Sequence, residues 1–195
     1  MVERQDAGLL QPSQPCALTP AGVVATSKER GSPVSNQDAG AEIRLAGVAD
    51  ARALSDMIRD FAAFERLPNA ATEESVRSEL SSADRVMNAV IALIDGRPVG
   101  FATFFQTYST FAARRGLYLE DIYVREDARN HGIATAILRF IARHAIERRF
   151  ARVEFTVLLW NNIAIEFFET LGATPNSAWT SYRLSGEWLE KLAKT

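Results

Sequence analysis

The chain has 195 residues, of which 47% are hydrophobic and 24% are charged, and its formal net charge is −2. This length suits one well-buried α/β domain and is short for two. The charge excludes a nucleic-acid binder that works through a strongly basic surface. A single cysteine, Cys16, excludes an intramolecular disulfide, and only two histidines, far apart in the chain, argue against a metal site.

Residues 1–41 contain four of the seven prolines, separated by Gln, Ser and Gly, with no hydrophobic period. We expect this segment to be a disordered arm and residues 42–195 to form one domain. The chain begins without the basic start and apolar middle of a signal peptide, and no apolar run approaches the ~20 residues of a membrane span. The cytoplasm is therefore the expected location, with no membrane partner.

The domain begins with an alternating strand at residues 42–46, followed by two helices. Apolar residues recur with helical spacing from Leu54 to Phe64, and Asp50 is a plausible N-cap of this first helix. Thr72 and the acids after it predict a second helix that runs to about Leu80. Glu65, near the end of the first helix, could meet a cation or be an ordinary exposed carboxylate.

Asp95-Gly96 joins two apolar strands, residues 86–94 and 97–107, with the strongest short hairpin signal. After a loop we expect a strand at 117–124, a helix at 133–146, a strand at 151–159, a helix at 163–170, a strand at 179–184 and a closing helix at 187–192. These elements predict an α/β fold with a mixed, mostly antiparallel central sheet of about six to seven strands, flanked by helices on both faces.

The loop before the helix at 133–146 has the chemistry of an anion site. Residues 129–135 place Gly132 and small side chains where the helix begins. The first amides of a helix have no partner within it, and the helix dipole favours negative charge there. The sequence therefore predicts a bound anion at this point.

Arg129-x-x-Gly132-x-Ala134 resembles the R/Q-x-x-G-x-G/A pyrophosphate loop of the GNAT-type N-acetyltransferases, which binds the diphosphate of acetyl-CoA. Tyr118-Leu119-Glu120-Asp121, Trp160-Asn161 and Leu171-Gly172-Ala173 stand around it in the matching order. Together they are similar to the diamine (spermidine/spermine) and thialysine-like branch. The resemblance covers about residues 42–194 and implies a GNAT fold, acetyl-CoA as co-substrate and a homodimer.

The resemblance also assigns residues to acetyl-CoA along the strand, the loop and the following helix. These are Ile122, Tyr123, Val124, Arg129, Asn130, His131, Gly132, Ile133, Ala134, Thr135, Asn161, Asn162, Ala164 and Phe168. Asn161 or Asn162 can also cap the helix at 163–170. In the resemblance Trp179 and Tyr182 border the acceptor pocket, although aromatic residues over a core are the commoner case.

Glu120 is the candidate general base. A lysine-like amine of pKa ~10.4 is protonated by about three orders of magnitude near pH 7, so a group must accept its proton before attack. A carboxylate in a sheet strand is costly without a reason. In a regular strand Glu120 and Asp121 point to opposite faces, so one would face the acetyl group and the other the substrate or a structural partner.

One position departs from the family pattern. The family's usual general acid is a tyrosine where this chain has Phe168, which cannot donate a proton. Either catalysis survives, with water, Tyr108 or Tyr182 as a substitute, because losing one general acid costs only about 10² to 10⁴ in rate, or the chain is a catalytically impaired acyl-CoA-binding regulatory protein. The intact Glu120 and loop favour the first alternative.

The acceptor is predicted to be a primary amine on a small molecule: an amino acid, a lysine analogue or a polyamine. Ser109 and Thr110 stand where the diamine-acetylating enzymes carry an acid, and two arginines follow. This departure argues against a polyamine. We therefore expect an acetyl-CoA-dependent N-acetyltransferase that works by direct attack in a ternary complex.

Overall fold

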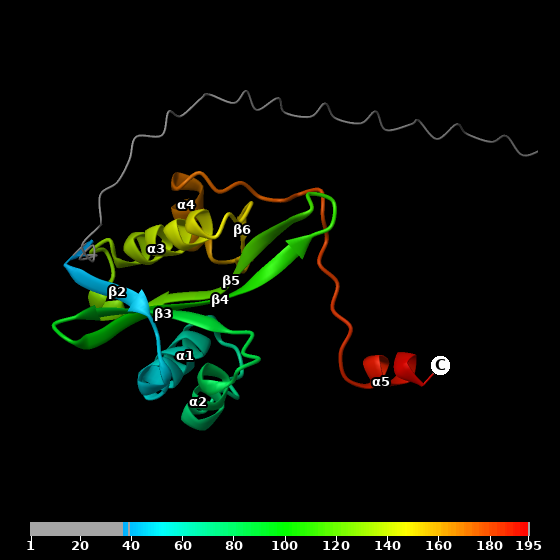
Figure 1. The fold of residues 1–195 in the computed structure, drawn as a ribbon, viewed down its shortest axis with the longest axis horizontal. Helices are drawn as coiled ribbons and strands as arrows, with labels where there is room; N and C mark the ends of the chain where they lie inside the picture. Colours follow the sequence, from blue (N-terminus) through cyan, green and yellow to red (C-terminus); the bar gives the residue numbers. More distant parts are fainter. Residues whose placement is uncertain (1–36, 39, 195) are drawn as a thin grey trace, which may run out of the picture. The chain divides into compact units, whose positions relative to one another are not determined.

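The computed structural model describes residues 37–38 and 40–194, which form an α/β domain around a six-stranded sheet (Figure 1). Its strands follow chain order: β1 (Gln37–Asp38), β2 (Ala41–Leu45), β3 (Asn88–Ile94), β4 (Arg97–Ser109), β5 (Arg114–Val124) and β6 (Val153–Glu154). Every neighbouring pair is antiparallel except β5 and β6, which are parallel. This confirms the predicted mixed, mostly antiparallel sheet.

The sheet begins at Gln37, inside the segment expected to be an arm. Residues 1–36 and 39 lie outside the described residues, so for them the expected disorder stays a prediction. No helix in the part of the chain that the structure describes is long and apolar enough to cross a membrane.

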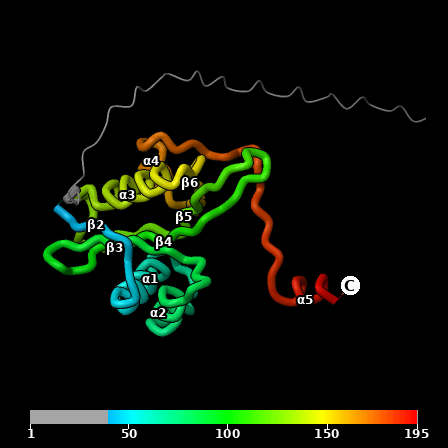
Figure 2. Tube along the Cα trace, in the orientation of Figure 1, coloured from blue at the N-terminus to red at the C-terminus, as the bar shows by residue number. Residues whose placement is uncertain are grey.

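Helices cover both faces of the sheet, as Figures 1 and 2 show. One face carries α1 (Ala51–Glu65) and α2 (Glu73–Ser81), which bury Leu54 and Val76 against Phe101 of β4. The other carries α3 (Ile133–Glu147), whose Ile137 packs with Phe104 and other buried residues. Two apolar clusters, one on each side, therefore hold the sheet as the middle layer.

Local signals at the element ends are confirmed except at Asp50. The Thr72 hydroxyl accepts from the Ser75 amide at the start of α2, and Asp95-Gly96 joins β3 to β4. Asp50 does not cap α1 with its side chain. Its carboxylate instead accepts from the Gly47 amide and from Arg44, both at 2.8 Å, because a 3₁₀ turn, η1 (Val48–Asp50), precedes the helix.

Two irregularities of the sheet shape the site. Thr103 lies opposite Asp121 and Phe104 opposite Leu119, so Glu120 is an extra residue with no partner on β4. This is a β-bulge, which re-aims the side chain that it carries. In addition, β5 and β6 pair only through Leu117–Tyr118 and Val153–Glu154, after which the two segments separate.

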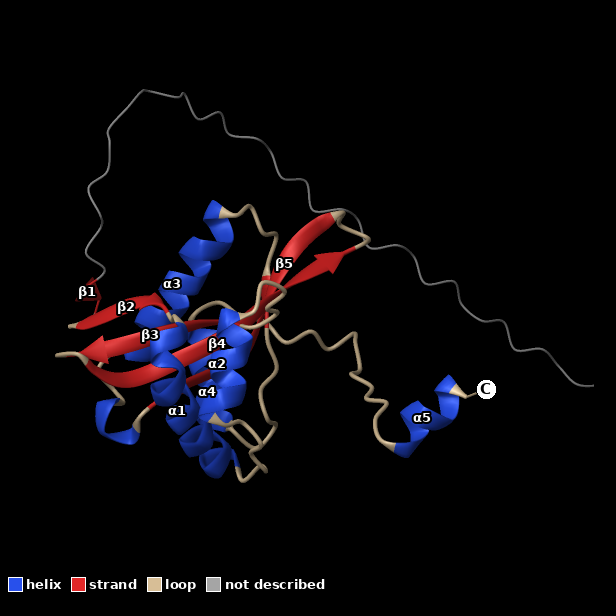
Figure 3. Ribbon diagram, turned by 60° about the horizontal axis from the view of Figure 1, so that its bottom comes forward, coloured by secondary structure: helices blue, strands red, loops and turns tan. Residues whose placement is uncertain are grey.

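Two predicted strands are corrected. The strand expected at 151–159 is only two residues long, because the chain leaves the sheet after Glu154 and reaches α4 (Asn162–Thr170) through a loop. The strand expected at 179–184 does not form: these residues have no regular structure and lead to α5 (Glu187–Ala193) (Figure 3). Their aromatic alternation is typical of a strand, but none of the strands that the structure describes pairs with them.

Candidate active site

A cavity of about 320 Å³ lies where β5 and β6 separate. Residues of β5, the loop after β6, α1, the start of α3 and α4 line it. Nine of the predicted site residues meet there: Glu120, Ile122, Tyr123, Val124, Arg129, Ala134, Asn161, Ala164 and Phe168. The structure thus brings together segments that are far apart in the sequence.

The sequence did not single out seven of the lining residues: Phe61, Phe64, Phe155, Thr156, Val157, Ile163 and Phe167. Phe61 and Phe64 were expected on the apolar face of α1, and nothing in their spacing distinguishes a core position from a cavity wall. The residues after β6 were expected to lie inside a regular strand. The early end of that strand exposes them to the cavity.

Three carboxylates lie in or next to the wall of this cavity. Glu65 from α1 and Glu120 from β5 line it, and Asp121 lies beside Glu120. The Thr103 hydroxyl donates to Asp121 Oδ2 over 2.7 Å. Glu120 lines the cavity while Asp121 bonds to Thr103, in line with the expectation that one carboxylate faces the site and the other a structural partner, although the bulge interrupts the regular alternation between them.

Burial and mutual repulsion hold these acids closer to neutrality than usual. Burial raises the pKa of Asp121, opposed by the Thr103 hydrogen bond. Burial also raises the pKa of Glu65 and of Glu120, and the charge of Asp121 raises both further. Arg183 opposes the rise at Glu120. Glu120 is therefore a better proton acceptor than a solvated glutamate, as a general base requires.

The loop before α3 borders the cavity, which Arg129 and Ala134 line. Asn130 and Gly132 adopt left-handed backbone conformations, with φ of 64° and 77°. The first amide to bond a backbone carbonyl of this turn is that of Ala136, which donates to Gly132 over 2.9 Å. The preceding amides have no intrahelical partner, so this helix start can bind an anion.

Arg129 links the loop to α1 and β5. Its Nε donates to the Val124 carbonyl over 3.1 Å, and its guanidinium lies 4.9 Å from the Phe64 ring and 5.8 Å from the Tyr123 ring. Two aromatic rings and one carbonyl thus fix the head of a long side chain. None of the described residues accepts from its two Nη atoms, which leaves them able to bind a phosphate.

Other predicted loop residues lie beside the cavity rather than in its wall. Ile133 is 1% exposed in the core under α3, so only its backbone can meet a ligand. His131 lines a second hollow, next to the Arg97–Asp127 ion pair. Asn130, Gly132, Thr135 and Asn162 do not line the main cavity.

The wall near α4 is aromatic. Phe168 is 8% exposed, and its ring centroid lies 4.3 Å from that of Phe155. Asn161 caps α4, because its Oδ1 accepts from the Ala164 amide over 3.2 Å. The Trp160 ring lies beside that of Phe64, with ring centroids 6.2 Å apart. The position expected to hold a general acid is therefore an apolar packing position.

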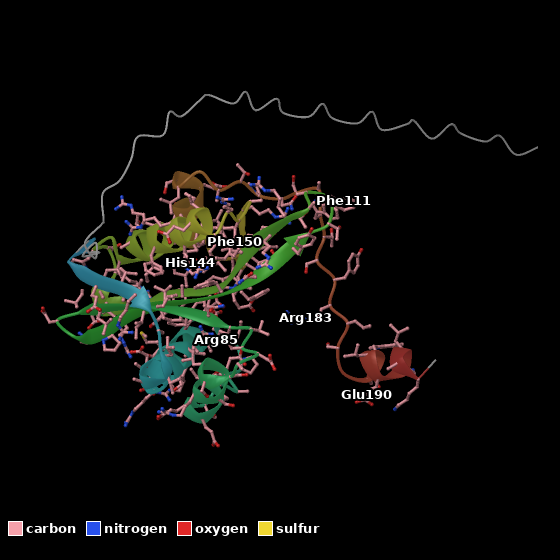
Figure 4. The ribbon with its side chains drawn as sticks, in the orientation of Figure 1. Arg85, Phe111, His144, Phe150, Arg183 and Glu190 are labelled. Carbon is pink, nitrogen blue, oxygen red and sulfur yellow. The ribbon has the colours of Figure 1, made fainter. Side chains whose placement is uncertain are left out.

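Residues proposed as substitutes or acceptor contacts on the outer segments lie elsewhere. Tyr108 is 62% exposed, Trp179 72% and Tyr182 92%, and none of them lines the cavity. Figure 4 labels Arg183 on the segment that leads to α5. A role for Trp179 and Tyr182 at an acceptor pocket therefore stays a prediction.

Comparisons with known proteins agree with this geometry. Residues 53–173 match the acetyltransferase (GNAT) family. A thialysine N-epsilon-acetyltransferase from Sus scrofa is 32% identical over 164 residues, which are 77% of this chain and 96% of that protein. An L-ornithine N5-acetyltransferase from Arabidopsis thaliana is 36% identical over 111 residues, 57% of this chain and 46% of that protein.

An integron cassette protein from V. cholerae shares the fold, with a TM-score of 0.70 and 24% identity over 80% of this chain and 99% of that one. The chain belongs to the acetyltransferase (GNAT) family. It is an N-acetyltransferase, similar to the thialysine-acetylating branch, which confirms the resemblance seen in the sequence.

Proposed function

We propose that the protein transfers the acetyl group of acetyl-CoA to a primary amine of a small molecule, by direct attack in a ternary complex. The observation that carries this proposal is the position of Glu120. The bulge places it without a β4 partner in the cavity between β5 and the loop after β6. Ala134, in the first turn of α3, lines the same cavity.

Acetyl-CoA fits the two ends of this site. The diphosphate would meet the amides that open α3 and the Nη atoms of Arg129. The pantetheine arm would follow β5 from Val124 toward Glu120, because that strand has no β6 partner beyond Tyr118 and its backbone groups can pair with amides of the cofactor. Asn161, Ala164 and the apolar wall of α4 would cover the arm from the other side.

The acetyl group then lies beside Glu120. The amine gives up its proton to Glu120, directly or through water, and its nitrogen forms the bond to the acetyl carbon while the bond to sulfur breaks. The raised pKa of Glu120 favours this proton transfer over that of a solvated glutamate. A positioned base of this kind contributes typically about 10² to 10⁴ in rate.

The charge at the acceptor end favours a cation. Glu65, Glu120 and Asp121 are all acidic, and Phe61 supplies an aromatic face to the same cavity. Aromatic faces and carboxylates together suit an aliphatic ammonium. The similarity to thialysine- and ornithine-acetylating enzymes supports an amino acid with a side-chain amine over a polyamine.

A non-catalytic acyl-CoA-binding protein is the alternative. Phe168 supports it, since a tyrosine is the usual donor there by resemblance. The carboxylates of Glu65, Glu120 and Asp121 argue against it, because they would repel an anionic cofactor rather than help to bind it.

We also propose that the protein is a homodimer. The C-terminal segment exposes Trp179, Tyr182, Trp188 and Leu192 by 61% or more. A helix as short as α5, with seven residues, is not stable in water by itself. A second copy offers the surface that would cover this segment, and light scattering of the full chain against a chain ending at residue 176 tests the pairing.

The function is tested with a panel of amines: lysine, thialysine, ornithine, spermidine and tyramine, each with acetyl-CoA and a thiol reagent for released CoA. We expect release with an amino acid that carries a side-chain amine. Tight acetyl-CoA binding with no release for any amine would favour the alternative. No binding of acetyl-CoA would contradict both.

A further inference from the structure

A hydrogen-bonded pair of hydroxyl groups, from Tyr118 and from Thr156 in the cavity wall, joins β5 to the loop after β6. The Tyr118 hydroxyl donates to Thr156 Oγ1 over 3.2 Å, joining β5 to the loop after β6. Tyr118 is itself held by a stacked contact with Phe105, with ring centroids 5.2 Å apart. This is the first side-chain bond across the opening beyond the last backbone pair.

Thr156 and Glu120 each lie two residues beyond the last backbone pair of β5 and β6, which is Tyr118 with Glu154. Both side chains line the cavity. A thioester lying between the two segments therefore has a carboxylate on one side and a hydroxyl on the other.

The hydrogen of the Thr156 hydroxyl is available to a ligand. Its oxygen already accepts from Tyr118, and within residues 40–194 no acceptor takes its own hydrogen. Accepting one hydrogen bond makes a hydroxyl a stronger donor for the next. Of the other polar side chains in the cavity wall, Arg129 is held by the Val124 carbonyl, and Asn161 is held at the start of α4, where its Oδ1 accepts from the Ala164 amide.

We propose that Thr156, positioned by Tyr118, is the hydrogen-bond donor to the departing CoA sulfur, in place of the missing tyrosine at Phe168. This inference rests on the proposed function and adds a catalytic residue to it. When the bond from carbon to sulfur breaks, its electron pair stays on sulfur as a thiolate, and the Thr156 hydroxyl donates to that charge. The proton lost by the amine goes to Glu120, so Thr156 need not give up its own.

A hydroxyl is a sufficient donor here because the departing thiol has a low pKa. A thiolate has a conjugate-acid pKa of ~8.5, below the ~10 of a tyrosine, so it leaves without full protonation. A hydrogen bond to a charged partner is enough to help it. Tyr118 is then a positioning residue, because it acts through Thr156.

The test compares Thr156→Val, which removes the hydroxyl at similar volume, with Thr156→Ser, which keeps it. We expect Thr156→Val to lower kcat roughly 10- to 100-fold, as for a lost hydrogen bond to a charge, with KM for acetyl-CoA changed less than threefold. Thr156→Ser should retain most of the rate, and Tyr118→Phe should lose several-fold.

A second substitution that restores the rate distinguishes a lost hydrogen-bond donor from a structural effect of Thr156→Val. In the double variant Thr156→Val/Phe168→Tyr, the new phenol should restore at least half of the lost rate on a logarithmic scale. A wild-type rate in Thr156→Val, or a slow Thr156→Val that Phe168→Tyr fails to rescue, would overturn the inference while leaving the proposed function intact. A wild-type protein that acetylates no amine would overturn both.

Discussion

Thr103 on β4 lies directly opposite Asp121 on β5 and donates its hydroxyl hydrogen to that carboxylate over 2.7 Å. This pairing fixes the bulge at Glu120. It also places a buried charge next to the candidate base, where it raises the pKa of both Glu120 and Glu65. The Thr103–Asp121 contact therefore positions the charge that raises the pKa of both glutamates.

We predict that Asp121→Asn stabilises the fold at neutral pH. Because the folded-state pKa of Asp121 is raised, folding favours its protonated form. Stability from this group is present below the unfolded pKa of ~3.9 and is lost as pH rises through the raised folded value. The variant should show a higher free energy of unfolding at pH 7 and no advantage near pH 3, measured by urea denaturation.

The same substitution should change the pH dependence of activity. Removing the Asp121 charge lowers the pKa of Glu120, so the acidic limb of kcat/KM should move to lower pH. Asn can still accept from Thr103, which preserves the bulge. An acidic limb at the wild-type position would show that Glu120 is not the titrating group.

We predict that Phe168→Tyr raises kcat several-fold, because its hydroxyl adds a donor to the cavity that Phe168 lines. Phe167→Tyr is the matched control, since Phe167 lines the same cavity. Steady-state kinetics with one amine compares the three proteins. Equal gains from both positions would indicate a general polarity effect rather than a placed donor.

Gly132→Ala should weaken acetyl-CoA binding. Its φ of 77° strains any residue with a Cβ by about 1 kcal/mol, and the loop that presents the amides must shift to relieve this. Gly96→Ala is the control, because Gly96 has φ of 76° in the distant β3–β4 hairpin and open space around its Cβ position.

Calorimetry with acetyl-CoA and thermal unfolding together distinguish the two glycines. Both variants should lose similar stability, and only Gly132→Ala should lose affinity, by about tenfold. Unchanged affinity in Gly132→Ala would remove the α3 loop from the cofactor site.

The sequence predicted the parts of this molecule that depend on local chemistry. The Thr72 cap, the Asp95-Gly96 turn and the loop at Gly132 each follow from the residue types that such positions require. The bulge at Glu120 did not follow, because no local residue marks it and it arises from pairing with a strand many residues away. The early end of β6 is likewise not marked by any local residue, and for this reason the sequence analysis did not single out Thr156.

In the C-terminal segment the sequence predicted a strand that does not form. Residues 179–184 alternate as a strand should, yet they pair with nothing in residues 40–194. A strand needs a partner edge, and the sequence of one chain does not say whether that edge belongs to the same copy.

The most direct measurement of the central claim is the rate of CoA release by Glu120→Gln against wild type, with saturating acetyl-CoA and the best amine of the panel. Glutamine keeps the size of the side chain but cannot accept the proton of the amine. The account predicts a fall in kcat of about 10² or more with acetyl-CoA affinity unchanged. Equal rates for the two proteins would contradict it.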